Sequence, residues 1–240
     1  MSYLGLVKPI INSYFKDQNI EQPRILEIGV DRGQTTYPLI QNLAQLFKTF
    51  IYVGIDINIQ NEVVESLTQF DSVSVAGWDE YSGRDAILIE ANSLKWLPLE
   101  KSRGPFYHLA LVDGDHNYFT LRQELEGLLP LLFADSIIVC DDYNGRWAEK
   151  DLFYSEKPEY ANVEIATKRQ NTEKQGVKAA VADFIKDHPE WEGYHHESLD
   201  PIILYNRVIW EPLETAHKSD EFINCRDMRW NFKRRVYNET

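Results

Sequence analysis

The stretch Arg24-Ile-Leu-Glu-Ile-Gly-Val-Asp-Arg-Gly33 decides the fold. Its apolar run Ile25–Ile28 predicts a short buried strand, and Gly29 and Gly33 predict a tight turn that leads into a helix. We expect Thr36 to cap that helix. A strand, a glycine turn and a helix N-terminus are together typical of a nucleotide-like ligand site in an open α/β sheet.

The turn also indicates which kind of ligand it suits. Its pattern, Glu27-x-Gly29-x-x-x-Gly33, lacks the G-x-G-x-x-G spacing that wraps a pyrophosphate. The carboxylate of Glu27, at the end of the strand, would repel a phosphate. The pattern therefore favours a cationic, phosphate-free ligand such as S-adenosylmethionine.

Length and composition restrict the possible partners. The chain has 240 residues, of which 43% are hydrophobic, which predicts one large domain or a domain with appendages. A net charge of −13 argues against a nucleic-acid partner, because nucleic-acid affinity depends on Lys and Arg. No apolar run approaches the roughly 20 residues of a membrane span. The N-terminus does not resemble a secretory signal, and two cysteines are too few for a disulfide framework. We expect a cytoplasmic protein without a membrane partner.

Apolar runs alternate with amphipathic segments along the chain. Further strands are predicted at 50–57, 86–90, 106–112 and 136–140, and two terminal strands at 191–197 and 201–208. Helices are predicted at 4–17 (broken or begun at Pro9), 37–48, 61–70, 118–129 and 176–187, with 71–85 as a loop. This order predicts an α/β fold with a doubly wound, Rossmann-like sheet and helices on both faces.

The same pattern predicts three parts of the chain. Residues 1–21 form a helical lead, 22–208 the main domain and 209–240 a C-terminal extension. Within the main domain, the stretch 144–175 is unusually long for a connection, which is typical of a functional lid or of a disordered segment. The N-terminal helix or the aromatic C-terminal tail would provide the contact for a homo-oligomer.

Acidic residues occur where the predicted strands end, at Glu27, Asp56, Asp113, Asp115, Asp141 and Asp142. In a doubly wound sheet the carboxyl ends of parallel strands open onto one crevice, so these side chains are expected to meet. Asp56 is placed to accept hydrogen bonds from a ribose diol; the alternative is that it caps the following helix.

A second group combines Asp113, Asp141 and Asp142. Ionised carboxylates this close need a cation, and oxygen ligands suit Mg²⁺; the alternative is three solvated acids. His116 follows Asp113 by three residues, which puts both side chains on one side of a helical turn. A neutral imidazole there could take a proton from a hydroxyl, although a histidine at such a position is also common as a polar loop residue.

Five segments come in the order of the class I S-adenosylmethionine-dependent methyltransferases, which the chain resembles over residues 22–208. They are Leu26–Thr36, Val53–Asp56, Leu111–Tyr118, Val139–Tyr143 and Gly176–Phe184. The glycine turn is similar to that of the catechol O-methyltransferase branch. The Asp-Gly-Asp-His and Asp-Asp-Tyr motifs resemble those of the metal-dependent sugar O-methyltransferases of macrolide biosynthesis.

The resemblance implies a fold and a set of site residues. It implies a seven-stranded sheet of order 3-2-1-4-5-7-6 with strand 7 antiparallel. The residues it implies for cofactor binding are Glu27, Gly29, Gly33, Thr35, Asp56, Asn92, Ser93 and Asp113. It further implies Asp113, Asp141 and Asp142 as Mg²⁺ ligands and His116, with Asp113, as catalytic residues. The insertion at 144–175 departs from the family pattern and implies a remodelled acceptor pocket.

The leading hypothesis is therefore an O-methyltransferase that uses S-adenosylmethionine and Mg²⁺ on a small polyhydroxylated acceptor, a sugar or a secondary metabolite. One alternative takes Asp113-Gly-Asp115 as the metal-binding motif of a nucleotide-sugar glycosyltransferase. Another is a non-catalytic subunit that binds S-adenosylmethionine.

Overall fold

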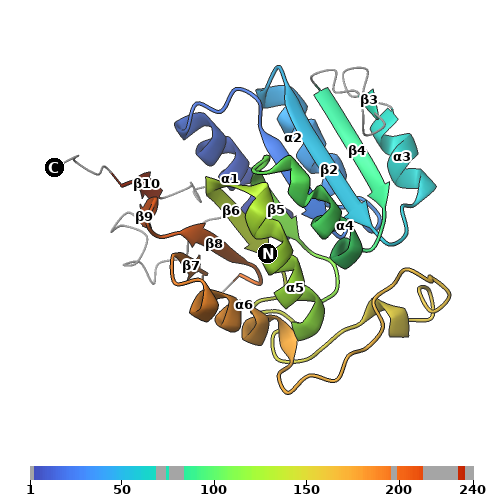
Figure 1. Cartoon of the computed structure of the whole chain (residues 1–240). Helices are drawn as coiled ribbons and strands as arrows, with labels where there is room; N and C mark the ends of the chain where they lie inside the picture. The colour runs from blue at the N-terminus through green and yellow to red at the C-terminus, as the bar shows by residue number, and fades with distance from the viewer. Residues whose placement is uncertain (1–2, 69–73, 76–83, 196–198, 213–231, 236–240) are drawn as a thin grey trace.

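A computed structural model describes residues 3–68, 74–75, 84–195, 199–212 and 232–235. In this part of the chain the strands form one large and one small sheet (Figure 1). The strands are β1 (Arg24–Ile28), β2 (Phe50–Asp56), β3 (Ser74–Val75), β4 (Arg84–Glu90), β5 (Tyr107–Val112), β6 (Leu132–Cys140), β7 (Trp191–Tyr194), β8 (Ile202–Asn206), β9 (Trp210–Pro212) and β10 (Phe232–Arg234). The helices are α1 (Tyr3–Asp17), α2 (Thr36–Leu46), α3 (Asn61–Thr68), α4 (Ser93–Glu100), α5 (Tyr118–Leu128) and α6 (Gly176–Asp187).

The large sheet has eight strands in the order β3-β4-β2-β1-β5-β6-β8-β7. Strand β1 lies at its centre, parallel to β2 and β5, while β8 is antiparallel to both β6 and β7. Apart from the short edge strand β3, this is the order 3-2-1-4-5-7-6 with strand 7 antiparallel. The predicted fold class is confirmed.

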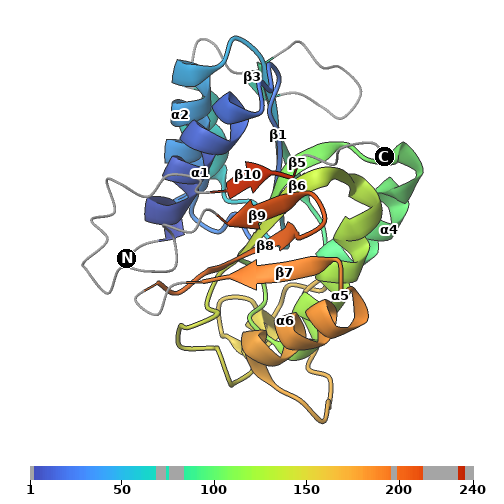
Figure 2. The same cartoon turned by 90° about the vertical axis from the view of Figure 1, so that its left-hand side faces the viewer.

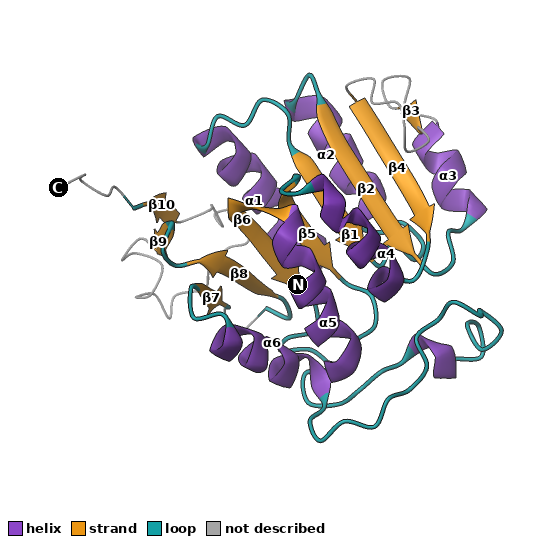
Figure 3. Ribbon diagram, viewed as in Figure 1, coloured by secondary structure: helices purple, strands orange, loops and turns teal. Residues whose placement is uncertain are grey.

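Helices cover both faces of the sheet, with α1, α2 and α3 on one face and α4, α5 and α6 on the other (Figures 2 and 3). Successive strand residues point to opposite faces. Ile25 accordingly packs with the first helical layer and Leu26 with the second. Each fully buried side chain of this size contributes about 1.5–3 kcal/mol, so the two apolar layers fix the sheet between the helices. No helix among the described residues has the length and apolar character that a membrane span requires.

The bounds of two predicted elements were wrong. Helix α1 continues through Pro9, where a break or a start was expected. Its residues Val7, Ile11 and Tyr14 are fully buried, so packing against the sheet outweighs the lost backbone hydrogen bond. Within 71–85, expected to be a loop, Ser74–Val75 pairs with β4 as a short parallel edge strand, and β4 begins at Arg84. A strand of two residues is too short to show alternating apolar residues in the sequence. Ser74–Val75 is a strand because its backbone pairs with β4.

The start of the C-terminal extension packs on the main domain. Trp210 is fully buried, its indole N–H donates to the carbonyl oxygen of Asp135 at 3.0 Å, and its ring meets that of Tyr14 edge-on. The pairing of β9 with β10 was not predicted. Residues 213–231 and 236–240 of the predicted extension lie outside the described residues.

Candidate cofactor and acceptor site

The glycine turn after β1 brings three strand ends together. Gly29 has φ +94°, in the left-handed region that favours glycine, and its N–H donates to the carbonyl oxygen of Ile55 at 2.8 Å. A Cβ at Gly29 would lie 2.1 Å from the carbonyl oxygen of Asp113. Only glycine lets the ends of β1, β2 and β5 approach this closely.

Asp56, at the end of β2, holds the turn in place. Its Oδ2 accepts the backbone N–H groups of Val30 at 2.8 Å and Asp31 at 2.9 Å, and its Oδ1 accepts that of Asn58 at 3.0 Å. Burial raises the pKa of the carboxyl, and these amides act in the opposite direction. The predicted contact with a ribose diol would use the remaining lone pairs of the same carboxylate.

Thr36 does not cap helix α2, contrary to the prediction. The N-cap is Thr35, without a side-chain cap hydrogen bond, and the Thr36 hydroxyl donates instead to Glu27 Oε2 at 2.8 Å. Tyr52 donates a second, short hydrogen bond to the same oxygen. Glu27 is fully buried, which raises its pKa to about 7. The Thr36 hydroxyl therefore binds the buried Glu27 carboxyl and not the free backbone N–H groups at the start of α2.

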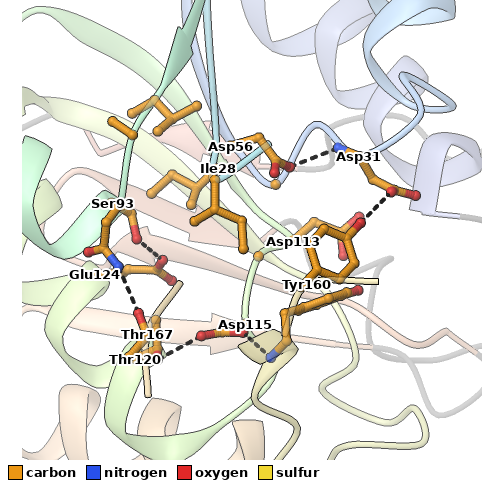
Figure 4. A pocket seen from close by; sticks show the side chains of 17 residues that line it. Ile28, Asp31, Asp56, Ser93, Asp113, Asp115, Thr120, Glu124, Tyr160 and Thr167 are labelled. Carbon is orange, nitrogen blue, oxygen red and sulfur yellow. Dashed lines mark hydrogen bonds between the residues drawn. The ribbon is translucent and has the colours of Figure 1, made fainter. Parts of the chain in front are cut away.

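A cavity opens at the carboxyl ends of β1, β2, β4 and β5 and encloses about 530 Å³, including space open to solvent (Figure 4). Among the described residues, the lining includes five carboxylic acids and no Lys, Arg or His. These acids are Asp31, Asp56, Asp113, Asp115 and Glu124. The cavity is therefore suited to a cation and unsuited to a phosphate.

Asn92 and Ser93, at the start of α4, form one side of the cavity. The Ser93 hydroxyl donates to Glu124 Oε1 of α5 at 2.6 Å. The Asn92 amide donates to the carbonyl oxygen of Ile165 at 2.8 Å and to the Thr167 hydroxyl oxygen at 2.9 Å. Both partners of Asn92 belong to the insertion at 144–175, so this segment is part of the site.

The insertion lies outside the carboxyl ends of the strands (Figure 3) and contacts the cavity at several points. The Tyr154 N–H donates to Asp115 Oδ1 at 2.8 Å, and the Tyr160 hydroxyl donates to Asp31 Oδ1 at 3.0 Å. Tyr154, Tyr160 and Thr167 all line the cavity. The insertion thus forms a wall of the predicted cofactor site.

Beside the cavity lies a cluster of three acids around His116. The imidazole Nε2 is 3.7 Å from Asp113 Oδ1, and its Nδ1 is 3.5 Å from Asp142 Oδ2. Burial, followed by repulsion from Asp141, raises the pKa of Asp113; burial likewise raises the pKa of Asp142 to about 6. Burial lowers the pKa of His116 to about 4, so the ring is neutral at pH 7.

This cluster supplies suitable donors for a hard cation, but the side chains do not yet converge. Carboxylate oxygens are the ligands Mg²⁺ prefers, and a cation would relieve the repulsion between Asp113 and Asp141. In the described part of the chain, however, no three His, Cys, Asp or Glu side chains are arranged to hold a metal ion. To hold Mg²⁺, the carboxylates of Asp113, Asp141 and Asp142 would have to turn towards a common point.

The structure thus places the predicted site residues in three groups. Gly29, Asp56, Asn92, Ser93 and Asp113 line the cavity, and His116, Asp141 and Asp142 gather next to Asp113. Glu27, Gly33 and Thr35 are not among the lining residues, so their contact with a cofactor stays a prediction.

Sequence reasoning missed Glu124 and the lining residues of the insertion. Glu124 is 1% exposed, although it looks like one polar residue among others on α5. Its spacing from Leu121 and Leu128, three and four residues away, puts it on the buried stripe of the helix, and this signal could have found it. The contacts of the insertion depend on tertiary structure and leave no local pattern.

One family model matches part of the chain. Residues 26–143 match the family model described as a methyltransferase domain, a stretch that includes the glycine turn, Asp56 and all three acids of the cluster. No curated protein sequence matches the chain.

Several solved structures are similar in shape. MycE methyltransferase from the mycinamycin pathway, in complex with Mg, SAH and mycinamycin VI, is 15% identical over 80% of this chain and 47% of its own, with a TM-score of 0.48. CalS11, a TDP-rhamnose 3'-O-methyltransferase of calicheamicin biosynthesis, is 16% identical over 80% and 75%, with a TM-score of 0.48. An O-methyltransferase from Bacillus cereus in complex with SAH is 14% identical over 85% and 80%, with a TM-score of 0.49.

This chain spans about half the length of the MycE chain that it matches. All three TM-scores lie below 0.5, so these likenesses bear on neither acceptor nor metal. The family match rests instead on the stretch that builds the sheet centre and the cavity. Residues 26–143, just under half of the chain, are similar to the methyltransferase domains that this family model describes.

Proposed function

We propose that this protein is an O-methyltransferase that transfers a methyl group from S-adenosylmethionine to a hydroxyl of a small polyhydroxylated acceptor, a sugar or a secondary metabolite, with the help of Mg²⁺. One observation carries the proposal: a cavity lined by five acids adjoins a second cluster of acids around a neutral histidine. The acids that line the cavity suit a sulfonium nucleoside. The acids around His116 suit an acceptor hydroxyl that must lose its proton.

The lining acids explain how the methyl donor would be held. S-adenosylmethionine, when bound, supplies a methyl group on a positively charged sulfur. Asp113 lies where the cavity meets the acid cluster, so its carboxylate would face that charge, and Asp56 would accept the ribose hydroxyls. In a site partly shielded from water, such attraction is stronger than in bulk solvent.

His116 would take the proton that the acceptor hydroxyl must lose. The ring is neutral at pH 7 and 93% buried from solvent, with Nε2 on the side of Asp113. Asp113, Asp141 and Asp142 would hold Mg²⁺, which lowers the pKa of a hydroxyl when bound. General-base catalysis of this kind typically contributes 10²–10⁴-fold. Positioning the acceptor oxygen against the methyl group would supply much of the remaining rate enhancement.

Calorimetric titration with S-adenosylhomocysteine and with a UDP-sugar, each with Mg²⁺, tests the proposal against the glycosyltransferase alternative. We expect S-adenosylhomocysteine to bind and the UDP-sugar not to bind, because the described lining of the cavity has no Lys, Arg or His side chain to pair with a pyrophosphate. Tight binding of the UDP-sugar alone would contradict the proposal.

Asp56→Asn should weaken binding of S-adenosylhomocysteine on the order of 100-fold. The amide keeps one oxygen, which can still accept the N–H groups of Val30 and Asp31, but its N–H₂ group then faces the Asn58 N–H, and one acceptor for the ribose hydroxyls and the negative charge are lost. Asp187→Asn is the matched control, since Asp187 lies on the surface in an ion pair with Arg122. Equal affinity of wild type and Asp56→Asn would remove Asp56 from the site.

The insertion at 144–175 should be cleaved readily by trypsin without ligand and be protected by S-adenosylhomocysteine. A ligand in the cavity would contact Tyr154, Tyr160 and Thr167 and so stabilise the closed position. The exposed residues Lys168 and Arg169 are the expected cleavage sites. Equal cleavage rates with and without ligand would contradict a role for the insertion as a lid.

A further inference from the structure

Among the described residues that line the cavity, one carboxylic acid has a buried oxygen without a hydrogen-bond partner. Asp56 accepts three backbone N–H groups, and Asp115 accepts the Tyr154 N–H and the Thr120 hydroxyl. Glu124 is different. Its Oε1 accepts the Ser93 hydroxyl, but among the described lining residues its Oε2 is the one buried side-chain oxygen with no hydrogen-bond partner.

An unpaired buried carboxyl is costly, so its presence at a ligand cavity requires an explanation. Leaving such a group unsatisfied lowers the stability of the fold. Glu124 is fixed by its place on the buried stripe of α5 and by Ser93, and cannot turn out to solvent. A ligand group that pairs with Oε2 would recover this cost on binding.

The rest of the lining indicates which part of the ligand would reach Glu124. Ile28 lies between the Asp56 side of the cavity and the Ser93–Glu124 side (Figure 4), and Ile55 and Ile57 also line it. Aliphatic side chains suit the faces of a purine ring, and Asp56 suits the ribose. The polar edge of the base would then point to Glu124.

We infer that Glu124 recognises the amino edge of the adenine ring and makes the site select an adenosyl over an inosyl ligand. The inference rests on the proposed function, because it assumes a nucleoside in this cavity. Adenine offers an amino donor beside a ring-nitrogen acceptor. Hypoxanthine carries an oxo group in place of the amino group, so it would set an acceptor against the carboxyl oxygen. Burial raises the pKa of Glu124 to about 8, and a hydrogen bond donated by the adenine amino group favours the ionised, accepting form.

Titration calorimetry with S-adenosylhomocysteine and S-inosylhomocysteine tests the inference on the wild-type protein. We expect at least tenfold tighter binding of the adenosyl compound, since a site built to pair with a polar group rejects the analogue that lacks it. Equal binding of the two compounds would overturn the role of Glu124 and leave the proposed function intact. Binding of neither would overturn both.

Glu124→Gln should reduce the preference to less than threefold, because the glutamine amide can donate to the oxo group of hypoxanthine. Glu126→Gln is the matched control. It is the same change on the same helix, but Glu126 pairs with Arg122 and His188 outside the cavity, and it should keep the full preference. A wild-type preference in Glu124→Gln would overturn the inference. If thermal unfolding showed that Glu124→Gln does not fold, the wild-type comparison would decide alone.

Discussion

Asp141→Asn is expected to weaken Mn²⁺ binding at least 100-fold while changing the affinity for S-adenosylhomocysteine less than threefold. Mn²⁺ serves as the probe because, like Mg²⁺, it prefers oxygen ligands in octahedral geometry. Asp141 adjoins Asp113 but is not among the residues that line the cavity. The substitution therefore removes one anionic ligand and leaves the nucleoside site in place.

Electron paramagnetic resonance of free Mn²⁺ in a titration measures this effect directly. Asp135→Asn is the matched control, since Asp135 lies on the same strand, β6, and interacts with Arg234 at 3.6 Å. Its Mn²⁺ affinity should equal that of wild type. An unchanged affinity in Asp141→Asn would remove Asp141 from the metal site, and failure of the wild type to bind Mn²⁺ would remove the metal from the proposal.

Gly29→Ala should lower the free energy of unfolding by more than about 3 kcal/mol and abolish cofactor binding. A left-handed backbone costs a non-glycine residue about 1–2 kcal/mol. The larger part of the loss comes from the clash of the new Cβ with the backbone of Asp113, 2.1 Å from its carbonyl oxygen. Since β1 and β5 meet at this point, the strands must separate or the turn must change.

Gly104→Ala separates the cost of a left-handed backbone from the cost of the steric clash. Gly104 also has a left-handed φ of +70°, but a Cβ there would meet nothing within 4 Å. It should therefore show the backbone cost alone. Thermal unfolding should give a decrease in Tm of roughly 10 °C for Gly29→Ala, at about 2–4 °C per kcal/mol, and a much smaller one for Gly104→Ala. Equal decreases would show that the close approach of Gly29 to Asp113 has no energetic weight.

Much of this site could be predicted from the sequence because the fold creates it by one geometric rule. Gly29, Asp56 and Asp113 are far apart in the chain, yet each follows a parallel strand, and parallel strands present their carboxyl ends at one edge. Alternation of apolar strands with amphipathic helices was enough to predict those strands. The sheet order itself came from the family resemblance.

The errors occurred where tertiary contacts outweigh local preference. Thr36 has the side chain of a good helix cap, but the buried Glu27 binds its hydroxyl. The insertion at 144–175 shows no apolar period, so nothing in it indicated that Tyr160 would reach Asp31. Such contacts depend on the path that the chain takes between the strands. A short sequence pattern does not predict that path.

A crystal structure of the protein grown with S-adenosylhomocysteine and Mn²⁺ is the most direct measurement of the central proposal, that acids from separate strands form one nucleoside site beside one metal site. We expect the ribose at Asp56, the adenine edge at Glu124, and Mn²⁺ among Asp113, Asp141 and Asp142. An adenosyl group bound elsewhere, or Mn²⁺ bound away from these three acids, would contradict it.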